Sequence, residues 1–155
     1  MNMKVIRRSR KRSIPGDIFV LQVRKGEYFF GRVISTKANV GGFKNCVLIY
    51  IYNAKSKDKN RIPELRRENL LIVPIATNYR PWTMGYFENV CNRPLTKDDV
   101  LSVHCFRNLF TGKYFDENNN ELSKRIDPCG EYGLDSFRTI DDAISEALGI
   151  PLAPD

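Results

Sequence analysis

Three neighbouring runs of β-branched and aromatic residues set the fold class: Asp17-Ile-Phe-Val-Leu-Gln-Val23, Tyr28-Phe-Phe-Gly-Arg-Val-Ile-Ser35 and Cys46-Val-Leu-Ile-Tyr-Ile-Tyr52. Their composition and length are typical of β-strands. Residues 24–27 form a short polar link in which Gly26 can adopt the positive φ of a tight turn. We therefore expect an antiparallel meander, and Gly31 inside the middle strand indicates a bulge or a sharp bend.

Beyond residue 52, shorter apolar runs alternate with polar loops. The runs at residues 70–75, 82–90 and 100–106 predict further strands. Residues 62–69 predict one or two helical turns, because Pro63 stands early enough for its missing N–H to do no harm. The polar stretch 116–120 predicts the tip of a hairpin.

The last part of the chain predicts an amphipathic helix. Thr139 is a suitable N-cap, and Asp141 and Asp142 follow in the first turn, where carboxylates complement the helix dipole. Gly149 and Pro151 then end the helix. The apolar stripe repeats at helical spacing: Ile140, Ala143, Ile144, Ala147 and Leu148. The sequence thus predicts an α+β fold, mainly β, with a curved antiparallel sheet or small, partly open barrel and a C-terminal amphipathic helix.

The length of 155 residues corresponds to one domain. Residues 1–13 carry six basic and no acidic side chains, so we expect a flexible basic arm followed by a single domain at residues 14–155. The formal net charge of +7 hides an acidic end, because residues 116–155 hold three basic and ten acidic side chains. Such polarity can steer an oppositely charged protein partner, although solvated loops and a helix face explain the same residues.

Neither a membrane span nor a secretion signal is expected, because no apolar run approaches the roughly 20 residues of a membrane helix and no apolar segment follows the basic N-terminus. We therefore expect a cytoplasmic protein with no membrane partner. Cys46, Cys91, Cys105 and Cys129 include no C-x-x-C pair. This spacing favours reduced thiols, buried or incidental, over a metal site or a disulfide.

Residues with catalytic potential are sparse. His104 is the only histidine, and the adjacent Cys105 points to the opposite face of the predicted strand. A pairing of His104 with one of the other cysteines stays open, although no local nucleophile signature supports it. The carboxylate pairs are explained by caps and turns, and no phosphate-binding glycine motif is present. We expect no catalytic residue, no metal and no cofactor.

Three stretches resemble the immunity protein twenty-six family of bacterial polymorphic-toxin and contact-dependent inhibition systems. The first is Ile14-Pro-Gly-Asp-Ile-Phe-Val-Leu21 followed by Gly26-Glu-Tyr-Phe-Phe-Gly-Arg-Val33, similar to the family's opening pair of strands. The second, Val47-Leu-Ile-Tyr-Ile-Tyr52, is similar to its next strand. The third is Pro81-Trp-Thr-Met-Gly-Tyr-Phe-Glu-Asn-Val90 with Arg93-Pro-Leu95, although Phe87 stands where we expect a tryptophan. The likeness covers about residues 14–125 and rests on the order of the stretches.

The resemblance implies a non-enzymatic protein, monomeric when free, that binds and neutralises the C-terminal domain of a cognate toxin. Many such toxins are nucleases, and nucleases are often basic because they bind phosphates. The acidic end of the chain would suit such a toxin, so we expect toxin contacts at Asp116, Glu117, Glu121, Asp127, Glu131, Asp135, Asp141 and Asp142. Tyr28, Phe30, Trp82 and Tyr86 are expected in the core instead.

Two other functions remain open on the sequence. The basic arm and the basic residues between 55 and 67 would suit a small barrel that binds nucleic acid. The acidic end would repel phosphates, however, and the aromatic residues lie among core-like neighbours, so direct nucleic-acid binding is not expected. A hydrolase built on a Cys–His pair is the more distant alternative.

Overall fold

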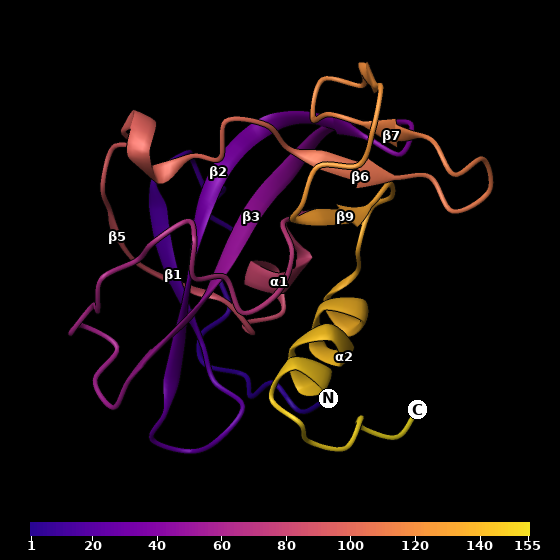
Figure 1. The fold of residues 1–155 in the computed structure, drawn as a ribbon. Helices are drawn as coiled ribbons and strands as arrows, with labels where there is room; N and C mark the ends of the chain where they lie inside the picture. The colour runs from indigo at the N-terminus through magenta and orange to yellow at the C-terminus, as the bar shows by residue number, and fades with distance from the viewer.

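The computed structural model describes all residues from Met1 to Asp155, and its centre is a five-stranded antiparallel sheet in the order β4-β3-β2-β1-β5 (Figure 1). The expected meander forms the middle of this sheet. It consists of β1 (Asp17–Leu21), β2 (Tyr28–Val40) and β3 (Phe43–Ser56), and the edge strands are β4 (Ile75–Thr77) and β5 (Glu88–Asn92). β2 and β3 exceed the runs that predicted them, because their pairing continues through several register shifts to the turn at Gly41 and Gly42.

Residues 46–52 of β3 are buried on both faces of the sheet. Their side chains alternate between two apolar clusters, with Val47, Ile49 and Ile51 on one face and Leu48, Tyr50 and Tyr52 on the other. Successive side chains of a strand point to opposite faces, so a strand without polar positions requires cover on both sides. The rest of the chain supplies these two covering layers.

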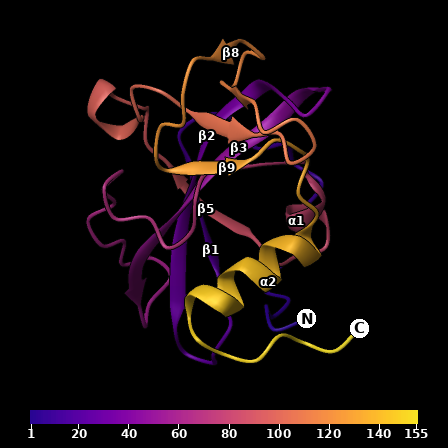
Figure 2. The ribbon, with the colours of Figure 1, turned by 45° about the vertical axis from the view of Figure 1, so that its right-hand side comes forward.

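One face of the sheet is covered by helices (Figure 2). Helix α2 (Phe137–Ala147) directs Ile140 and Ile144 into the cluster that contains Val47. The short helix α1 (Arg80–Thr83) adds Trp82, whose ring packs edge-on against Phe19 with 5.3 Å between the ring centroids.

The opposite face meets a second, four-stranded sheet in the order β8-β7-β6-β9, which lies across one end of β2 and β3 (Figures 1 and 2). Its strands are β6 (Cys105–Arg107), β7 (Tyr114–Phe115), β8 (Glu121–Leu122) and β9 (Cys129–Glu131). Phe106 of β6 joins the cluster of Tyr50 and Tyr52. The predicted hairpin tip at residues 116–120 is confirmed, since β7 and β8 pair on either side of it. β6 and β9 run parallel, the one parallel pair of strands in the fold.

Helix α2 begins three residues earlier than predicted. Its N-cap is Ser136, whose Oγ accepts a hydrogen bond from the N–H of Thr139, so Thr139 lies inside the first turn. The predicted cap was wrong because Ser136 satisfies the free N–H groups first, with Phe137 as an additional apolar residue of the helix. The predicted end is confirmed, since Gly149 has a φ of +68° and donates its N–H to the carbonyl of Glu146.

Residues 1–13, expected to be a flexible arm, lie against the domain in this structure. The backbone N–H groups of Lys4 and Ile6 donate to the carbonyls of Gln22 and Gly85, both at 2.7 Å. Met3 is buried in the same cluster as the apolar face of α2. The segment was predicted to be free because of its high basic charge. Its two apolar residues, Met3 and Ile6, nevertheless pack against the apolar clusters of the domain.

Four other predicted elements differ from the structure. Residues 82–90 form α1, a turn and only the start of β5, because Pro81 initiates a helical turn there. Residues 70–75 and 100–106 contribute no more than the short strands at their ends, and residues 62–69 contain no helical turn.

The overall architecture is nevertheless as predicted: mainly β, with two open sheets and one C-terminal amphipathic helix. Phe30, Trp82 and Tyr86 are buried as expected, whereas Tyr28 is half-buried. Neither α-helix combines the length and the apolarity that crossing a membrane requires.

Gly31 gives a direct test of this packing. A methyl group at Gly31 would meet the ring of Phe19 and lie 2.8 Å from the carbonyl oxygen of Tyr50. We expect Gly31→Ala to lower the free energy of unfolding by about 1–3 kcal/mol, as overpacking in a core does. Gly133→Ala, where no heavy atom lies within 4 Å, is the matched control and leaves urea unfolding unchanged. Equal unfolding curves for both variants would contradict the close approach of β1 and β2.

Candidate functional site

The eight predicted contact residues occupy three separate places in the fold. Asp116, Glu117 and Glu121 lie on or beside the β7–β8 hairpin, Asp127, Glu131 and Asp135 lie on or beside β9, and Asp141 and Asp142 lie on α2. Their local surroundings differ in burial, in hydrogen-bond partners and in the presence of a nearby cation.

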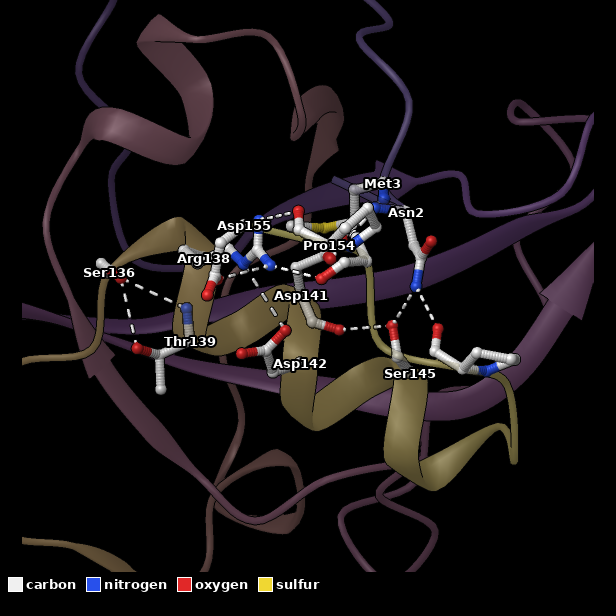
Figure 3. A network of polar contacts seen from close by, with 12 residues as sticks. Asn2, Met3, Ser136, Arg138, Thr139, Asp141, Asp142, Ser145, Pro154 and Asp155 are labelled. Carbon is white, nitrogen blue, oxygen red and sulfur yellow. Dashed lines mark hydrogen bonds and ion pairs between the residues drawn. The ribbon is translucent and has the colours of Figure 1, made fainter.

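Asp141 is an internal residue rather than a surface one (Figure 3). Its two carboxylate oxygens accept hydrogen bonds from the backbone N–H groups of Asn2 and Met3, at 3.0 and 2.6 Å. Ser145, one turn later, accepts a hydrogen bond from the side chain of Asn2 at 2.8 Å. Asp141 therefore fastens the N-terminal segment to α2 and is inaccessible to a partner in this arrangement.

Three of the other carboxylates are paired with cations close in sequence or across the hairpin. The oxygen–nitrogen distances are 3.6 Å for Asp142 and Arg138, 3.4 Å for Glu121 and Lys113, and 2.8 Å for Asp127 and Arg125. Each pair is at least partly exposed, so it contributes little to stability but cancels much of the local negative potential. The surface formed by residues 116–155 is thus less negative than the number of acidic residues in this part of the sequence suggests.

Glu117 belongs to a buried chain of polar groups. The hydroxyl of Tyr50 is 2.5 Å from Nε2 of His104, and Nδ1 of His104 is 3.1 Å from a carboxylate oxygen of Glu117. The Tyr50 hydroxyl also accepts the backbone N–H of Leu101 at 3.0 Å, which leaves its proton for Nε2. The contact with His104 lowers the pKa of Glu117, and burial raises the pKa of Tyr50 to about 12. This chain of contacts connects the β7–β8 hairpin to β3.

His104 has no cysteine partner in this arrangement, because Tyr50 and Glu117 occupy its two ring nitrogens. The four cysteines are free, and the sulfur atoms of Cys105 and Cys129 lie 3.3 Å apart on the paired strands β6 and β9. Burial raises the pKa of Cys129 to about 11, which keeps its thiol protonated and weakly nucleophilic at neutral pH. The Cys–His arrangement considered for a hydrolase therefore has no geometric support.

Asp116 accepts the backbone N–H groups of Asn118 and Asn120, both at 2.9 Å, and so shapes the hairpin tip. Glu131 is exposed on β9 and has no ion-pair partner. Asp135 follows β9 and is half-buried, and its carboxylate has neither an ion pair nor a hydrogen-bond donor. Burial, with a smaller effect of Glu131, raises the pKa of Asp135 to about 6. Asp116, Glu131 and Asp135 are therefore the predicted contact residues that have no cationic partner, and of these three only Glu131 is exposed.

Two surface features were missed by the sequence analysis. A cleft of about 400 Å³ lies between the N-terminal segment and β5, and Arg7, Arg8 and Lys11 line it together with Asp17 and Glu88. The loop between β6 and β7 exposes two apolar side chains, Leu109 and Phe110. The only sequence signal for this loop was an apolar pair flanked by the turn-forming residues Asn108 and Gly112.

A family model described as Immunity protein 26 matches residues 14–115, well over half of the chain. The chain belongs to the Immunity protein 26 family. The family predicted by resemblance is thereby confirmed. No match is found among curated proteins or among solved structures.

The match covers the five-stranded sheet and ends at Phe115, the last residue of β7. The scaffold of this Immunity protein 26 family member therefore lies inside the match, together with the exposed β6–β7 loop. All eight predicted contact residues lie outside the match. Family membership supports a role as an immunity protein but assigns no contact residue.

Asp135 makes the stability depend on pH. Its pKa in the fold is higher than the 3.8 of the free side chain, so its ionisation is unfavourable in the folded state. We expect this penalty to be absent near pH 3, to grow as the pH rises toward 6 and to be constant above that. Asp135→Asn then raises the free energy of unfolding at pH 7 by about 1–2 kcal/mol after allowance for partial exposure. Urea titrations at pH 3.5 and pH 7 check this, and an equal effect at both pH values would contradict it.

Asp141 gives the second test. Asp141→Ala leaves the N–H groups of Asn2 and Met3 without an acceptor, so we expect a loss of about 2–3 kcal/mol of stability and release of the N-terminal segment. Asp142→Ala is the control, because Asp142 forms only a half-exposed ion pair and its removal costs less than about 1 kcal/mol. Hydrogen exchange at residues 2–9 reads out the release directly. Unchanged protection in Asp141→Ala would show that the carboxylate does not hold this segment.

Proposed function

We propose that this Immunity protein 26 family member neutralises one cognate toxin domain in the cytoplasm by binding it one-to-one, without a cofactor and without chemistry of its own. The family match over residues 14–115 carries this proposal. The absence of an accessible nucleophile–base pair around His104 agrees with it, because both ring nitrogens serve buried contacts. Inhibition then depends on surface complementarity alone.

The partner we propose is a toxin domain with nuclease activity, delivered by contact-dependent inhibition or a related secretion system. A nuclease binds phosphates and therefore has a basic substrate surface. Asp116 and Glu131, which have no cationic partner, lie on the small sheet and its hairpin and supply the negative charge for such a surface. The other six predicted residues contribute less in this proposal: Asp141 is buried, Glu117, Glu121, Asp127 and Asp142 are paired with cationic or histidine side chains, and burial disfavours the ionised form of Asp135.

Nucleic-acid binding remains a second candidate because of the cleft beside β5. Arg7, Arg8 and Lys11 place three cations along a hollow of about 400 Å³. A phosphate backbone bound there would be released steeply as the salt concentration rises, whereas a protein complex with a buried interface would persist. Asp17 and Glu88 line the same cleft and weaken its positive potential.

The experiment is co-expression of the tagged protein with the C-terminal domain encoded by the gene directly upstream, followed by purification in low and high salt. We expect an equimolar complex that survives high salt and a neighbouring domain that is toxic when expressed alone. Salt-sensitive retention of nucleic acid, with neither toxicity nor a complex, would replace this proposal by nucleic-acid binding.

Glu131→Lys tests the acidic contribution. With a basic toxin we expect its association rate to fall about tenfold or more at low salt, because a like charge replaces an attractive one at the interface. Glu146→Lys is the matched control: it changes the net charge equally, and Glu146 is exposed in the last turn of α2, a helix whose C-terminal end points away from the small sheet in Figure 1. Stopped-flow association kinetics distinguish the two variants. Equal rates would mean that total charge acts, and that Glu131 is not at the interface.

A further inference from the structure

The loop between β6 and β7 projects from the molecule in Figure 1. Asn108 holds its shape: the side-chain oxygen accepts the backbone N–H groups of Phe110 and Thr111 at 2.9 and 3.2 Å. The backbone of Asn108 also closes the base of the loop, through hydrogen bonds with Lys113 and Gly112 at 2.8 Å. Gly112 has a φ of +73°, which suits a glycine. The loop is therefore an ordered turn that presents its tip in one conformation.

The tip consists of two apolar side chains that are largely exposed to solvent. The side chain of Phe110 is fully exposed, at 101% of its reference area, and Leu109 is 62% exposed. No other large hydrophobic residue of the chain is as exposed as these two. Burying an exposed phenylalanine side chain is favourable by about 2–3 kcal/mol. In the isolated protein Phe110 stays in solvent, so this free energy is available for binding a partner.

A hollow adjoins the tip. It has a volume of about 220 Å³ and is lined by Arg107, Leu109, Arg125, Cys129, Gly130 and Glu131. A partner could therefore bury the Phe110 side chain in a pocket of its own and place one of its side chains in this hollow. Aromatic anchors of this kind contribute a large share of the binding free energy in protein interfaces.

The charged residues of the loop indicate which groups a partner should carry around its binding site. Residues 107–113 contain Arg107 and Lys113 and no acidic residue. Lys113 is paired with Glu121, but no carboxylate lies within 4.0 Å of the Arg107 guanidinium. The loop thus combines an apolar tip with one unpaired cation at its base.

We propose that Phe110, with Leu109 beside it, inserts into an apolar pocket on the toxin domain, and that Arg107 meets a carboxylate at the rim of that pocket. This proposal rests on the proposed function and names the anchor of the complex. It complements the role of Glu131: the acidic residue steers the encounter, and the aromatic residue slows dissociation. Because the turn is already ordered, little conformational entropy is lost on binding.

A second copy of this chain is a poor binding partner for the loop. Two copies each carry a formal net charge of +7 and would repel one another. A two-residue tip also falls far short of the roughly 800 Å² per partner that a stable dimer buries. A folded toxin domain can cover the surrounding surface of the small sheet as well as the tip, which supplies the area that two tips alone lack.

The experiment compares Phe110→Ala, Phe110→Leu and the control Leu152→Ala for binding to the purified domain encoded upstream. Leu152 is 48% exposed and belongs to the segment after α2, whose C-terminal end lies in the lower part of Figure 1, whereas the loop lies in the upper part. We expect the dissociation constant to rise about 30-fold or more for Phe110→Ala, as for an interface anchor. Phe110→Leu retains part of the affinity, and Leu152→Ala binds like the unmodified protein. The thermal unfolding midpoint stays the same in all three, because Phe110 packs against nothing.

A photo-crosslinking benzophenone amino acid at position 110 adds a readout that does not depend on affinity, and we expect it to crosslink to the toxin domain. Normal binding by Phe110→Ala together with no crosslink would overturn this inference while leaving the proposed function intact. Failure of the unmodified protein to bind or neutralise the domain would instead overturn the proposed function. A dimer in sedimentation experiments that Phe110→Ala abolishes would assign the loop to self-association and also overturn the inference.

Discussion

The burial of β3 on both faces is the constraint on which the other elements depend. Residues 46–52 leave no polar position for solvent, so the chain must supply one layer over Val47, Ile49 and Ile51 and another over Leu48, Tyr50 and Tyr52. The first layer is made by α1, α2 and Met3, which are far apart in sequence. The second includes Phe106 of the small sheet. The position of the small sheet, and thus of every exposed feature on it, follows from the need to cover the tyrosine-bearing face of β3.

Local patterns predicted the elements whose packing is local. The strands around Phe19, Phe30 and Ile49 follow from composition and length, and the stripe through Ile140 and Ile144 predicted α2. The predictions and the structure differ where a distant contact decides the local conformation. Thr139 has the chemistry of an N-cap, but Phe137 finds apolar neighbours and so extends the helix back to Ser136. Residues 1–13 have the composition of a free arm, yet Asp141, about 140 positions away, provides the acceptors that hold it.

The candidate site was harder to predict than the fold because charge counted along a sequence differs from charge on a surface. Ten acidic residues after residue 115 suggested one acidic face, but pairing in space is local and selective. Arg138, Lys113 and Arg125 are only three cations, and each lies beside a different carboxylate of the predicted set. Glu117 is drawn to a histidine and Asp141 to backbone N–H groups, and neither partner can be recognised from sequence spacing.

The residues that stabilise this fold differ from those proposed to contact a partner. The family match over residues 14–115 therefore shows the family but not the contact residues. The rings of Phe19 and Phe87 are stacked with 4.4 Å between their centroids, and the ring of Trp82 packs edge-on against both, so these aromatic residues of the resemblance serve packing. Tyr50 and His104 also face inward. In the proposed complex the partner contacts the outer surface of the small sheet, which is held to β3 by Phe106 and by the contacts of Glu117. That attachment keeps Glu131 and the Asn108 turn in fixed positions, and a protein that inhibits by complementarity alone depends on such fixed positions to lose little entropy on binding.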